Sequence, residues 1–228
     1  MRVHVAFTPA EEGSARVGVV VDVIRASSSI AAALAAGYER VLCCREIDEA
    51  KALRAELGDE AVLGGEREGV VVPGFDVGAS PREFAAGARA PTLILSTTNG
   101  TAAILTAAAR CETVFVGALL NLHAVANAVR AAGDDVAIFC AGFKDAFALD
   151  DAYCAGRFVQ ELDGPRSDAA IAAELVARAF PKALEGLNAR TYGPPGLEAD
   201  IEFCARESVL ETVPRFSRMV RTAAEIVA

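Results

Sequence analysis

Short runs of β-branched and other apolar residues alternate along the chain with alanine-rich stretches. Such alternation predicts an α/β fold in which a mostly parallel sheet is flanked by helices. The predicted strands lie near Val3–Phe7, Val17–Val23, Arg40–Cys44, Thr92–Ser96, Thr113–Val116 and Val136–Cys140. The predicted helices are Ser28–Ala36, Ile47–Leu57, Gly100–Ala109, Leu120–Ala131 and Asp150–Leu162. An α-rich C-terminal part is expected from about residue 163.

Length and composition are those of a globular protein. The chain has 228 residues, which is enough for one well-buried core, so a single domain over residues 1–228 is expected. The longest apolar runs, such as Val17–Val23, are broken by charge well before the roughly twenty residues that a membrane-spanning helix needs. The N-terminal residues lack the pattern of a signal peptide. We therefore expect a cytoplasmic protein without a membrane partner.

Charge and cysteine content narrow the classes of function. The formal net charge is −9, which argues against a nucleic-acid partner, because binding to a phosphate backbone needs a basic face. An anionic substrate would need a local cluster of Arg, Lys and backbone N–H groups. The six cysteines form no C-x-x-C pair, so buried, reduced thiols are expected.

Two predicted strands end in hydroxyl-rich segments where a helix begins. The first segment runs from Asp22 through Arg25 to Ser27, Ser28 and Ser29, and the second is Ser96-Thr97-Thr98-Asn99-Gly100-Thr101. Such residues cap helices, and the N-terminus of a helix favours an anion. A plain N-cap explains the first segment about equally well. Two such ends at the edge where parallel sheets bind ligands favour an anion site.

Two further segments carry charged residues. Cys140–Asp151 takes a predicted strand into a loop with Lys144 and then into the adjacent acids Asp150 and Asp151, which are either partners of a helix dipole or metal ligands. Gly64–Pro81 is glycine-rich and contains Glu66, Arg67 and Asp76, a pattern more typical of a loop than of a site.

The collected acids favour Mg²⁺ over zinc. Asp22, Glu66, Asp76, Asp150 and Asp151 are hard oxygen ligands, and the chain has only two histidines, His4 and His123. The chain contains no P-loop, no G-x-G-x-x-G fingerprint, no cysteine-phosphatase loop and no common aspartyl-phosphatase motif.

Five segments occur together in a fixed order: VVVDVIRASSSI (Val19–Ile30), GGER (Gly64–Arg67), GFDVGASP (Gly74–Pro81), LSTTNGT (Leu95–Thr101) and CAGFKDAFALDDAYCAG (Cys140–Gly156). In this order they resemble the 2-phosphosulfolactate phosphatase (ComB) family of Mg²⁺-dependent acid phosphatases, which is linked to coenzyme M biosynthesis. Ala79 departs from this resemblance, because asparagine is expected there.

The resemblance implies hydrolysis of 2-phospho-3-sulfolactate to 3-sulfolactate and phosphate, with Mg²⁺ as cofactor. The residues themselves allow this chemistry: Asp22, Glu66, Asp150 and Asp151 are the expected metal ligands, and Asp22, Lys144, Asp150 and Asp151 are the expected catalytic residues. Arg25, Arg67, Ser27, Ser28 and Ser96–Thr101 would bind the anionic substrate. A Mg²⁺-activated water is the preferred nucleophile, with Asp150 or Asp151 as general base, and attack by Asp22 is the alternative.

Two other functions stay open. An enzyme of the same fold could act on a different acidic phosphorylated 2-hydroxy acid, and a non-catalytic anion-binding domain would use the same helix ends. The alanine-rich stretch Leu120–Ala131 would suit self-association as a homodimer, although packing on the sheet explains its pattern equally well.

Overall fold

The computed structural model describes residues 1–11 and 13–228. Its strands are β1 (Val3–Ala6), β2 (Val17–Val21), β3 (Arg40–Cys43), β4 (Ala61–Arg67), β5 (Val70–Val71), β6 (Thr92–Ser96), β7 (Thr113–Gly117), β8 (Val136–Cys140), β9 (Arg215–Val220) and β10 (Ala223–Val227). Its helices are α1 (Ala26–Ala35), α2 (Ile47–Leu57), α3 (Pro81–Ala85), α4 (Gly100–Arg110), α5 (Leu122–Ala132), α6 (Leu149–Glu161), α7 (Asp168–Ala179), α8 (Ala183–Asn188) and α9 (Glu198–Cys204). Short 3-10 turns are η1 (Gly58–Glu60) and η2 (Leu119–Asn121).

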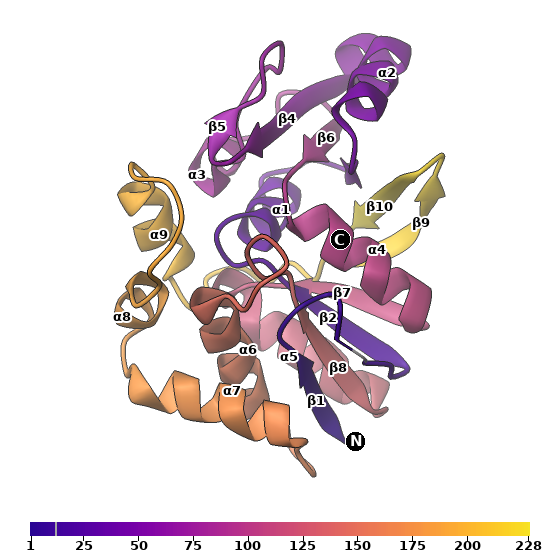
Figure 1. The fold of residues 1–228 in the computed structure, drawn as a ribbon. Coiled ribbons are helices and arrows are strands. Elements are labelled where there is room, and N and C mark those ends of the chain that lie inside the picture. The colour runs from indigo at the N-terminus through magenta and orange to yellow at the C-terminus, as the bar shows by residue number, and fades with distance from the viewer. Residues whose placement is uncertain (12) are drawn as a thin grey trace.

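The sheet of the described residues consists of two parallel blocks joined by a hairpin. Its order is β1-β8-β2-β7-β9-β10-β3-β6-β4-β5. Pairing is parallel within β1-β8-β2-β7, the lower block of Figure 1, and within β3-β6-β4, the upper block. The hairpin β9–β10 pairs antiparallel with β7 on one side and with β3 on the other. These three successive antiparallel pairings make the strands of the two blocks run in opposite directions.

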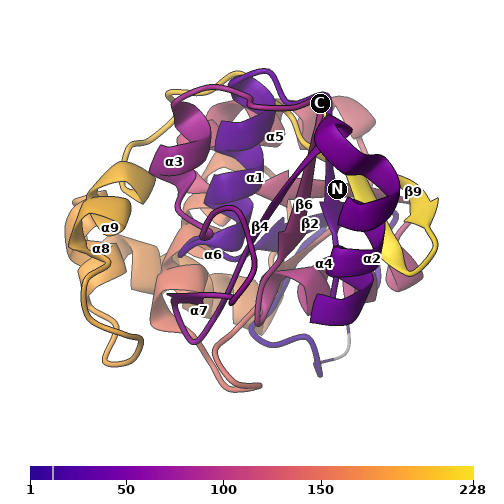
Figure 2. The same ribbon diagram turned by 90° about the horizontal axis from the view of Figure 1, so that it is seen from above.

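Both faces of the lower block are covered, which explains why its strands are apolar without alternation. Val19 and Val21 on β2 pack into the core that α5, α6 and α7 complete, whereas Val20 points to the opposite core with Ile30 of α1 and Ile104 of α4. A third, smaller core lies between α2 and the upper block. Figures 1 and 2 both place α8 and α9 on the side of the molecule opposite the β9–β10 hairpin.

The structure confirms the predicted α/β fold, with a mostly parallel sheet and helices in the C-terminal part. Two segments differ from the prediction. The GGER segment is the end of strand β4 and not a loop, and its glycines allow a close approach, since a Cβ atom at Gly65 would lie 2.3 Å from the Ser96 carbonyl oxygen. The final residues, expected to belong to an α-rich tail, form β9 and β10.

Other expectations concern thiols, membranes and self-association. The six cysteines are free, and all except the half-buried Cys111 are buried, as predicted. Across residues 1–11 and 13–228, every helix is too short or too polar to cross a bilayer. Leu122, Val125 and Val129 of α5 are buried in the lower-block core, which accounts for the apolar face of this helix. The homodimer stays a prediction.

Candidate active site

A cavity of about 340 Å³ lies where the carboxyl ends of both blocks meet. Asp22 follows β2 and Gly142 follows β8 in the lower block, while Glu66 ends β4 and Thr97 follows β6 in the upper block. The expectation of one shared edge in one parallel sheet is therefore replaced by two opposed blocks whose carboxyl ends face a common space. The cavity is lined by Asp22, Ile24, Arg25, Ala26, Glu66, Glu68, Gly69, Ala79, Thr97, Thr98, Asn99, Gly142, Phe143, Lys144, Ala148, Asp150, Asp151, Arg190, Tyr192, Gly193, Pro194 and Leu197.

Asp22 lies between the N-termini of two helices. Its Oδ1 accepts a hydrogen bond from the backbone N–H of Ala26 (3.2 Å), the first residue of α1. A Cβ atom at Gly100, the first residue of α4, would lie 2.8 Å from Asp22 Oδ2 and 2.4 Å from the Ala26 Cβ. Glycine at position 100 thus lets the two helix ends approach this carboxyl group. Helix N-termini carry unpaired N–H groups and a partial positive charge, so this end of the cavity suits an anion.

Asp150 and Asp151 enter the cavity from the first turn of α6, but their surroundings differ. The two oxygens of Asp151 accept backbone N–H groups, one from Val23 (2.9 Å) and one from Gly142 (3.0 Å). Asp150 Oδ1 accepts the hydroxyl of Tyr192 and the N–H of Asp151. Asp151 therefore ties the ends of β2 and β8 together, whereas Asp150 is held by one oxygen only.

Glu66 brings a carboxylate from the upper block. Its Oε1 accepts the N–H (2.9 Å) and the hydroxyl (3.0 Å) of Thr98, and its Oε2 accepts the N–H of Gly69 (2.6 Å). The bonds from Thr98 fix the carboxylate against the loop that leads from β6 into α4, and the bond from Gly69 fixes it against the turn between β4 and β5.

Burial and mutual repulsion disturb the acid–base chemistry of these carboxyl groups. Burial, together with the charges of Asp150 and Glu66, raises the pKa of Asp22 to about 7, against the opposing effects of the Ala26 N–H and of Arg25. Burial also raises the pKa of Asp150, and burial with the charges of Asp150 and Asp22 raises that of Asp151. Such clusters of disturbed carboxyl groups in a cavity are typical of active sites.

Three cationic side chains line the cavity: Arg25, Lys144 and Arg190. Arg25 forms a buried ion pair with Asp200 (2.7 Å), and Ser80 donates a hydrogen bond to the same carboxylate. Lys144 pairs with Glu68 (2.9 Å) at an exposed position.

Several residues predicted to bind substrate do not line the cavity. The guanidinium of Arg67 donates to the carbonyl oxygens of Arg45, Glu66 and Ser96 and to Ser96 Oγ, so it joins β4 to its neighbours. The hydroxyls of Ser27 and Ser28 donate to the carbonyl oxygens of Asp22 and Val23. Ser96, Gly100 and Thr101 are buried outside the cavity lining, whereas Thr97, Thr98 and Asn99 do line the cavity. The roles of these residues stay predictions.

The contribution of the loop between α8 and α9 to the cavity was not predicted from the sequence. This loop supplies Arg190 and Tyr192 to the cavity wall, and α9 supplies Asp200, the partner of Arg25. The only signal in the sequence is the Tyr192-Gly193-Pro194-Pro195-Gly196 turn, whose residue types do not reveal which part of the fold the loop covers.

The donor set suits a hard divalent cation, although the carboxylates do not form a ready-made cage. No three His, Cys, Asp or Glu side chains within residues 1–11 and 13–228 are grouped closely enough to hold a metal ion. Mg²⁺ is usually held by one or two carboxylates together with water and substrate phosphate. The carboxylates of Asp22 and Glu66 repel each other across one cavity, which fits that mode of binding.

Comparisons with known proteins agree with the resemblance seen in the sequence. The family model described as 2-phosphosulpholactate phosphatase matches residues 5–218. A protein of Thermus thermophilus named probable 2-phosphosulfolactate phosphatase is 39% identical, covering 94% of each chain. Proteins of the same name from Pseudothermotoga lettingae and Symbiobacterium thermophilum are 38% and 36% identical, covering 94% and 93% of this chain and 95% and 96% of theirs. The chain belongs to the 2-phosphosulfolactate phosphatase family.

Proposed function

We propose that this protein hydrolyses the phosphate monoester of 2-phospho-3-sulfolactate to 3-sulfolactate and inorganic phosphate. The observation that carries the proposal is the cavity in which carboxylates from both blocks meet the N-termini of α1 and α4. The chain also belongs to a family whose members are named probable 2-phosphosulfolactate phosphatase. A non-catalytic anion-binding domain has no need for several converging carboxylates that repel one another.

The phosphoryl group would bind where α1 and α4 begin. Thr97, Thr98 and Asn99 line this end of the cavity, and the hydroxyl of Thr97 is buried without a hydrogen-bond partner among the described residues. A buried hydroxyl without a partner is unfavourable, so a ligand oxygen at this place would satisfy it. Arg25 adds positive charge on the same wall, and its guanidinium is held in place by Asp200.

Asp22 of the lower block and Glu66 of the upper block would hold Mg²⁺, together with water and substrate. When bound, the cation would draw negative charge from the phosphoryl oxygens. This assignment uses the two carboxylates that come from different blocks, and it leaves Asp151 to its two backbone partners.

The chemical step that fits these residues is an in-line attack of water on phosphorus. Asp150 would accept a proton from the attacking water while the bond from phosphorus to the ester oxygen breaks, and the leaving alkoxide would take up a proton from solvent water. Of the predicted pair Asp150 and Asp151, Asp150 is the better base, because both oxygens of Asp151 already accept N–H groups. A phosphoryl–enzyme that hydroxylamine cleaves would instead identify Asp22 as a nucleophile.

The test is phosphate release from 2-phospho-3-sulfolactate and from a panel of other phosphorylated 2-hydroxy acids, with Mg²⁺ and with EDTA. The panel is needed because Ala79, which departs from the expected family residue, lies on the cavity wall. Asp22→Asn should lower kcat by at least about a hundredfold, whereas Asp163→Asn, an exposed acid outside the cavity, should not change it.

The outcomes separate the candidate functions. Mg²⁺-dependent release with 2-phospho-3-sulfolactate as the best substrate supports the proposal, and a higher kcat/KM for another panel member would replace the substrate but not the reaction. Binding of phosphate without turnover of any compound would favour the anion-binding domain. The links to coenzyme M biosynthesis and to the cytoplasm stay predictions.

A further inference from the structure

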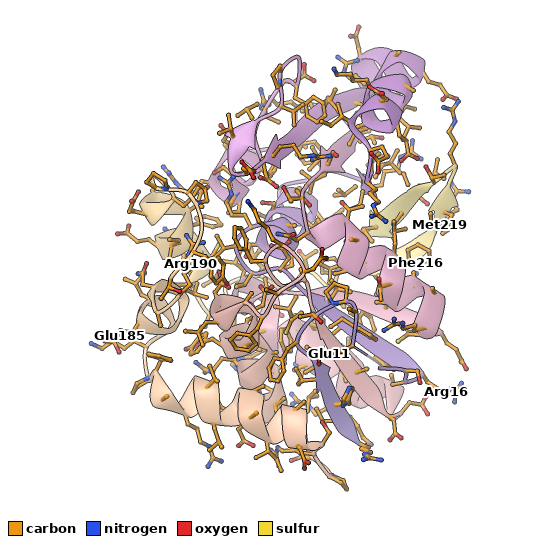
Figure 3. All side chains as sticks on the ribbon, in the orientation of Figure 1. Glu11, Arg16, Glu185, Arg190, Phe216 and Met219 are labelled. Atoms are coloured by element: carbon orange, nitrogen blue, oxygen red, sulfur yellow. The ribbon has the colours of Figure 1, made fainter. Side chains whose placement is uncertain are left out.

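The loop that joins α8 to α9, residues 189–197, forms one wall of the cavity and carries its third cationic side chain, Arg190 (Figure 3). Arg25 and Lys144 each form an ion pair with a carboxylate, Arg25 with Asp200 and Lys144 with Glu68. Arg190 differs, because no carboxylate of the described residues forms an ion pair with it. Its charge opposes the rise in the pKa of Asp150, but its guanidinium forms no ion pair there and is therefore available to a bound anion.

Aromatic stacking holds this wall in place. The ring of Tyr192 stacks on Phe143 with centroids 4.6 Å apart, and its hydroxyl donates to Asp150. The guanidinium carbon of Arg190 lies 5.9 Å from the centre of the Tyr192 ring. Arg190 thus packs on the Tyr192 ring, whose hydroxyl contacts Asp150, the proposed general base.

Gly193 gives the guanidinium its space. A Cβ atom at this position would lie 2.5 Å from Arg190 Nη1 and 3.2 Å from its Cζ. The backbone of Gly193 has φ +100°, a conformation that side chains rarely adopt. Any residue other than glycine would push Arg190 away from this place.

We infer that Arg190 binds the acidic group of the substrate other than the phosphoryl group, a carboxylate or a sulfonate, and so determines specificity for acidic phosphate esters. The inference rests on the proposed function. The phosphoryl end already has the helix N-termini and Arg25, whereas the other cation of the cavity wall, Lys144, already forms an ion pair with Glu68. Arginine suits this role, because its planar guanidinium binds carboxylate and sulfonate oxygens in pairs.

The experiment compares Arg190→Gln with wild type on three substrates: 2-phospho-3-sulfolactate, 2-phospholactate without the sulfonate, and the phosphate ester of 2-hydroxyethanesulfonate without the carboxylate. Loss of a charged hydrogen-bonding partner should raise KM for the complete substrate about 10- to 100-fold. The truncated substrate that keeps the group bound by Arg190 should show the same rise, and the other should show little change. Arg190→Lys should restore part of the loss, because it keeps the charge.

Calorimetric binding of 3-sulfolactate and of inorganic phosphate gives a readout that does not depend on turnover. Arg190→Gln should weaken the binding of 3-sulfolactate about 10-fold or more and leave the affinity for inorganic phosphate unchanged. Equal losses for all three substrates, or for both ligands, would overturn the inference, and so would no loss at all. Absence of turnover in the wild type would overturn the proposed function alone, provided that 3-sulfolactate still binds through Arg190.

Two glycine variants separate the position of Arg190 from strain in the loop. Gly193→Ala and Gly196→Ala both place a side chain at positive φ, but a Cβ atom at Gly196 has nothing within 4 Å. Gly193→Ala should therefore raise KM in the same substrate-dependent way as Arg190→Gln, and Gly196→Ala should not. Equal effects of the two variants would contradict a direct role of Arg190.

Discussion

Asp22 is a carboxyl group whose position costs the protein stability. Burial and the charges of Asp150 and Glu66 raise its pKa to about 7, so ionisation is harder in the folded state than in the unfolded chain. The protonated form of Asp22 therefore favours the folded state. This contribution to stability is complete below the unfolded-state pKa, near 4, and is lost as the pH rises through 7. At pH 8 in EDTA, Asp22→Asn should raise the free energy of unfolding by about 2–4 kcal/mol.

Thermal unfolding of wild type and Asp22→Asn between pH 5 and pH 8 measures this difference. The advantage of the variant should grow with pH, and at pH 8 it should amount to about 5–10 °C in Tm. Asp163→Asn, at an exposed position, provides the baseline. A variant that is less stable than wild type throughout this range would contradict the predicted electrostatic strain.

Asp151 differs from Asp22 in its backbone hydrogen bonds, although burial raises the pKa of both carboxyl groups. Its two oxygens accept the N–H groups of Val23 and Gly142, and an asparagine could accept only one of them while its NH₂ group would face the other donor. Leaving a buried N–H without a partner costs about 1–3 kcal/mol. Asp151→Asn should therefore lower the urea midpoint at pH 7, and an unchanged or higher midpoint would show that these bonds add little.

Residue type and position in the sequence located the carboxylates of the site, but not every side chain around them. Asp22 lines the cavity because it directly follows strand β2, while Lys144 and Asp150 reach it from the loop after β8 and from the first turn of α6. Arg67 stands beside Glu66 in the sequence, but neighbouring residues on a strand point to opposite faces of the sheet. The guanidinium of Arg67 therefore binds backbone carbonyl oxygens, such as that of Arg45, instead of facing the cavity. Arg190 lies far along the chain in a loop, where only the tertiary structure shows what it covers.

At the scale of helices, the contact between the N-termini of α1 and α4 forms the proposed phosphoryl site. Gly100→Ala would place a methyl group 2.4 Å from the Ala26 Cβ and force the two helix ends apart. Separation of these ends removes N–H groups from their places around the anion, so we expect kcat/KM to fall at least about tenfold. Gly13→Ala, whose nearest contacts are at 3.4 Å, should leave kcat/KM unchanged. Equal activity of both variants would place the phosphoryl group elsewhere.

The hairpin β9–β10 depends on a buried carboxylate. Glu225 of β10 pairs with Arg40 of β3 (3.1 Å) and with Arg218 of β9 (2.8 Å), which links three strands between the two blocks. Burial raises the pKa of Glu225, but the two arginines outweigh it, so the pKa lies below its ordinary value. Its ionised form therefore stabilises the fold above about pH 4.5, and this contribution is lost as the pH falls.

Glu225→Gln should lower the free energy of unfolding at pH 7 by about 1–3 kcal/mol. The difference from wild type should narrow as the pH falls below 4. Urea unfolding at several pH values measures it, with Glu112→Gln in the exposed pair with Arg16 as a control that should change stability little. A constant difference at all pH values would assign the effect to packing instead of charge.

The elements themselves were largely predictable, because apolar strands covered on both faces and alanine-rich helices differ clearly in pattern. Helix α2 begins and ends at the predicted residues, Ile47 and Leu57. Strand β9 was missed because Arg215–Val220 is largely exposed and mixes charged with apolar residues. Insertion of this hairpin reverses the upper block, a property of topology that no local pattern carries.

At the scale of the whole molecule, reversal of the upper block places the candidate site between two oppositely directed blocks. The protein that carries this site has a net charge of −9. Asp22 belongs to the lower block and Glu66 to the upper block, and their charges repel each other. A cation between them would offset that repulsion and join the blocks. Binding to the folded state alone would raise stability by mass action, about 2.7 kcal/mol at one hundred times Kd.

Mg²⁺ should therefore raise the Tm of the wild type by about 5–10 °C at saturation, compared with EDTA at equal ionic strength. Asp22→Asn and Glu66→Gln should each lose most of this rise, because each removes one charge from the pair that faces the cation. Asp163→Asn should keep the full rise. NaCl at matched ionic strength, without Mg²⁺, is the control for charge screening. If screening alone stabilised the protein, NaCl would raise the Tm of the wild type as much as Mg²⁺ does. If Asp22→Asn and Glu66→Gln kept the full shift, Mg²⁺ would bind elsewhere and the two blocks would be joined by protein contacts alone.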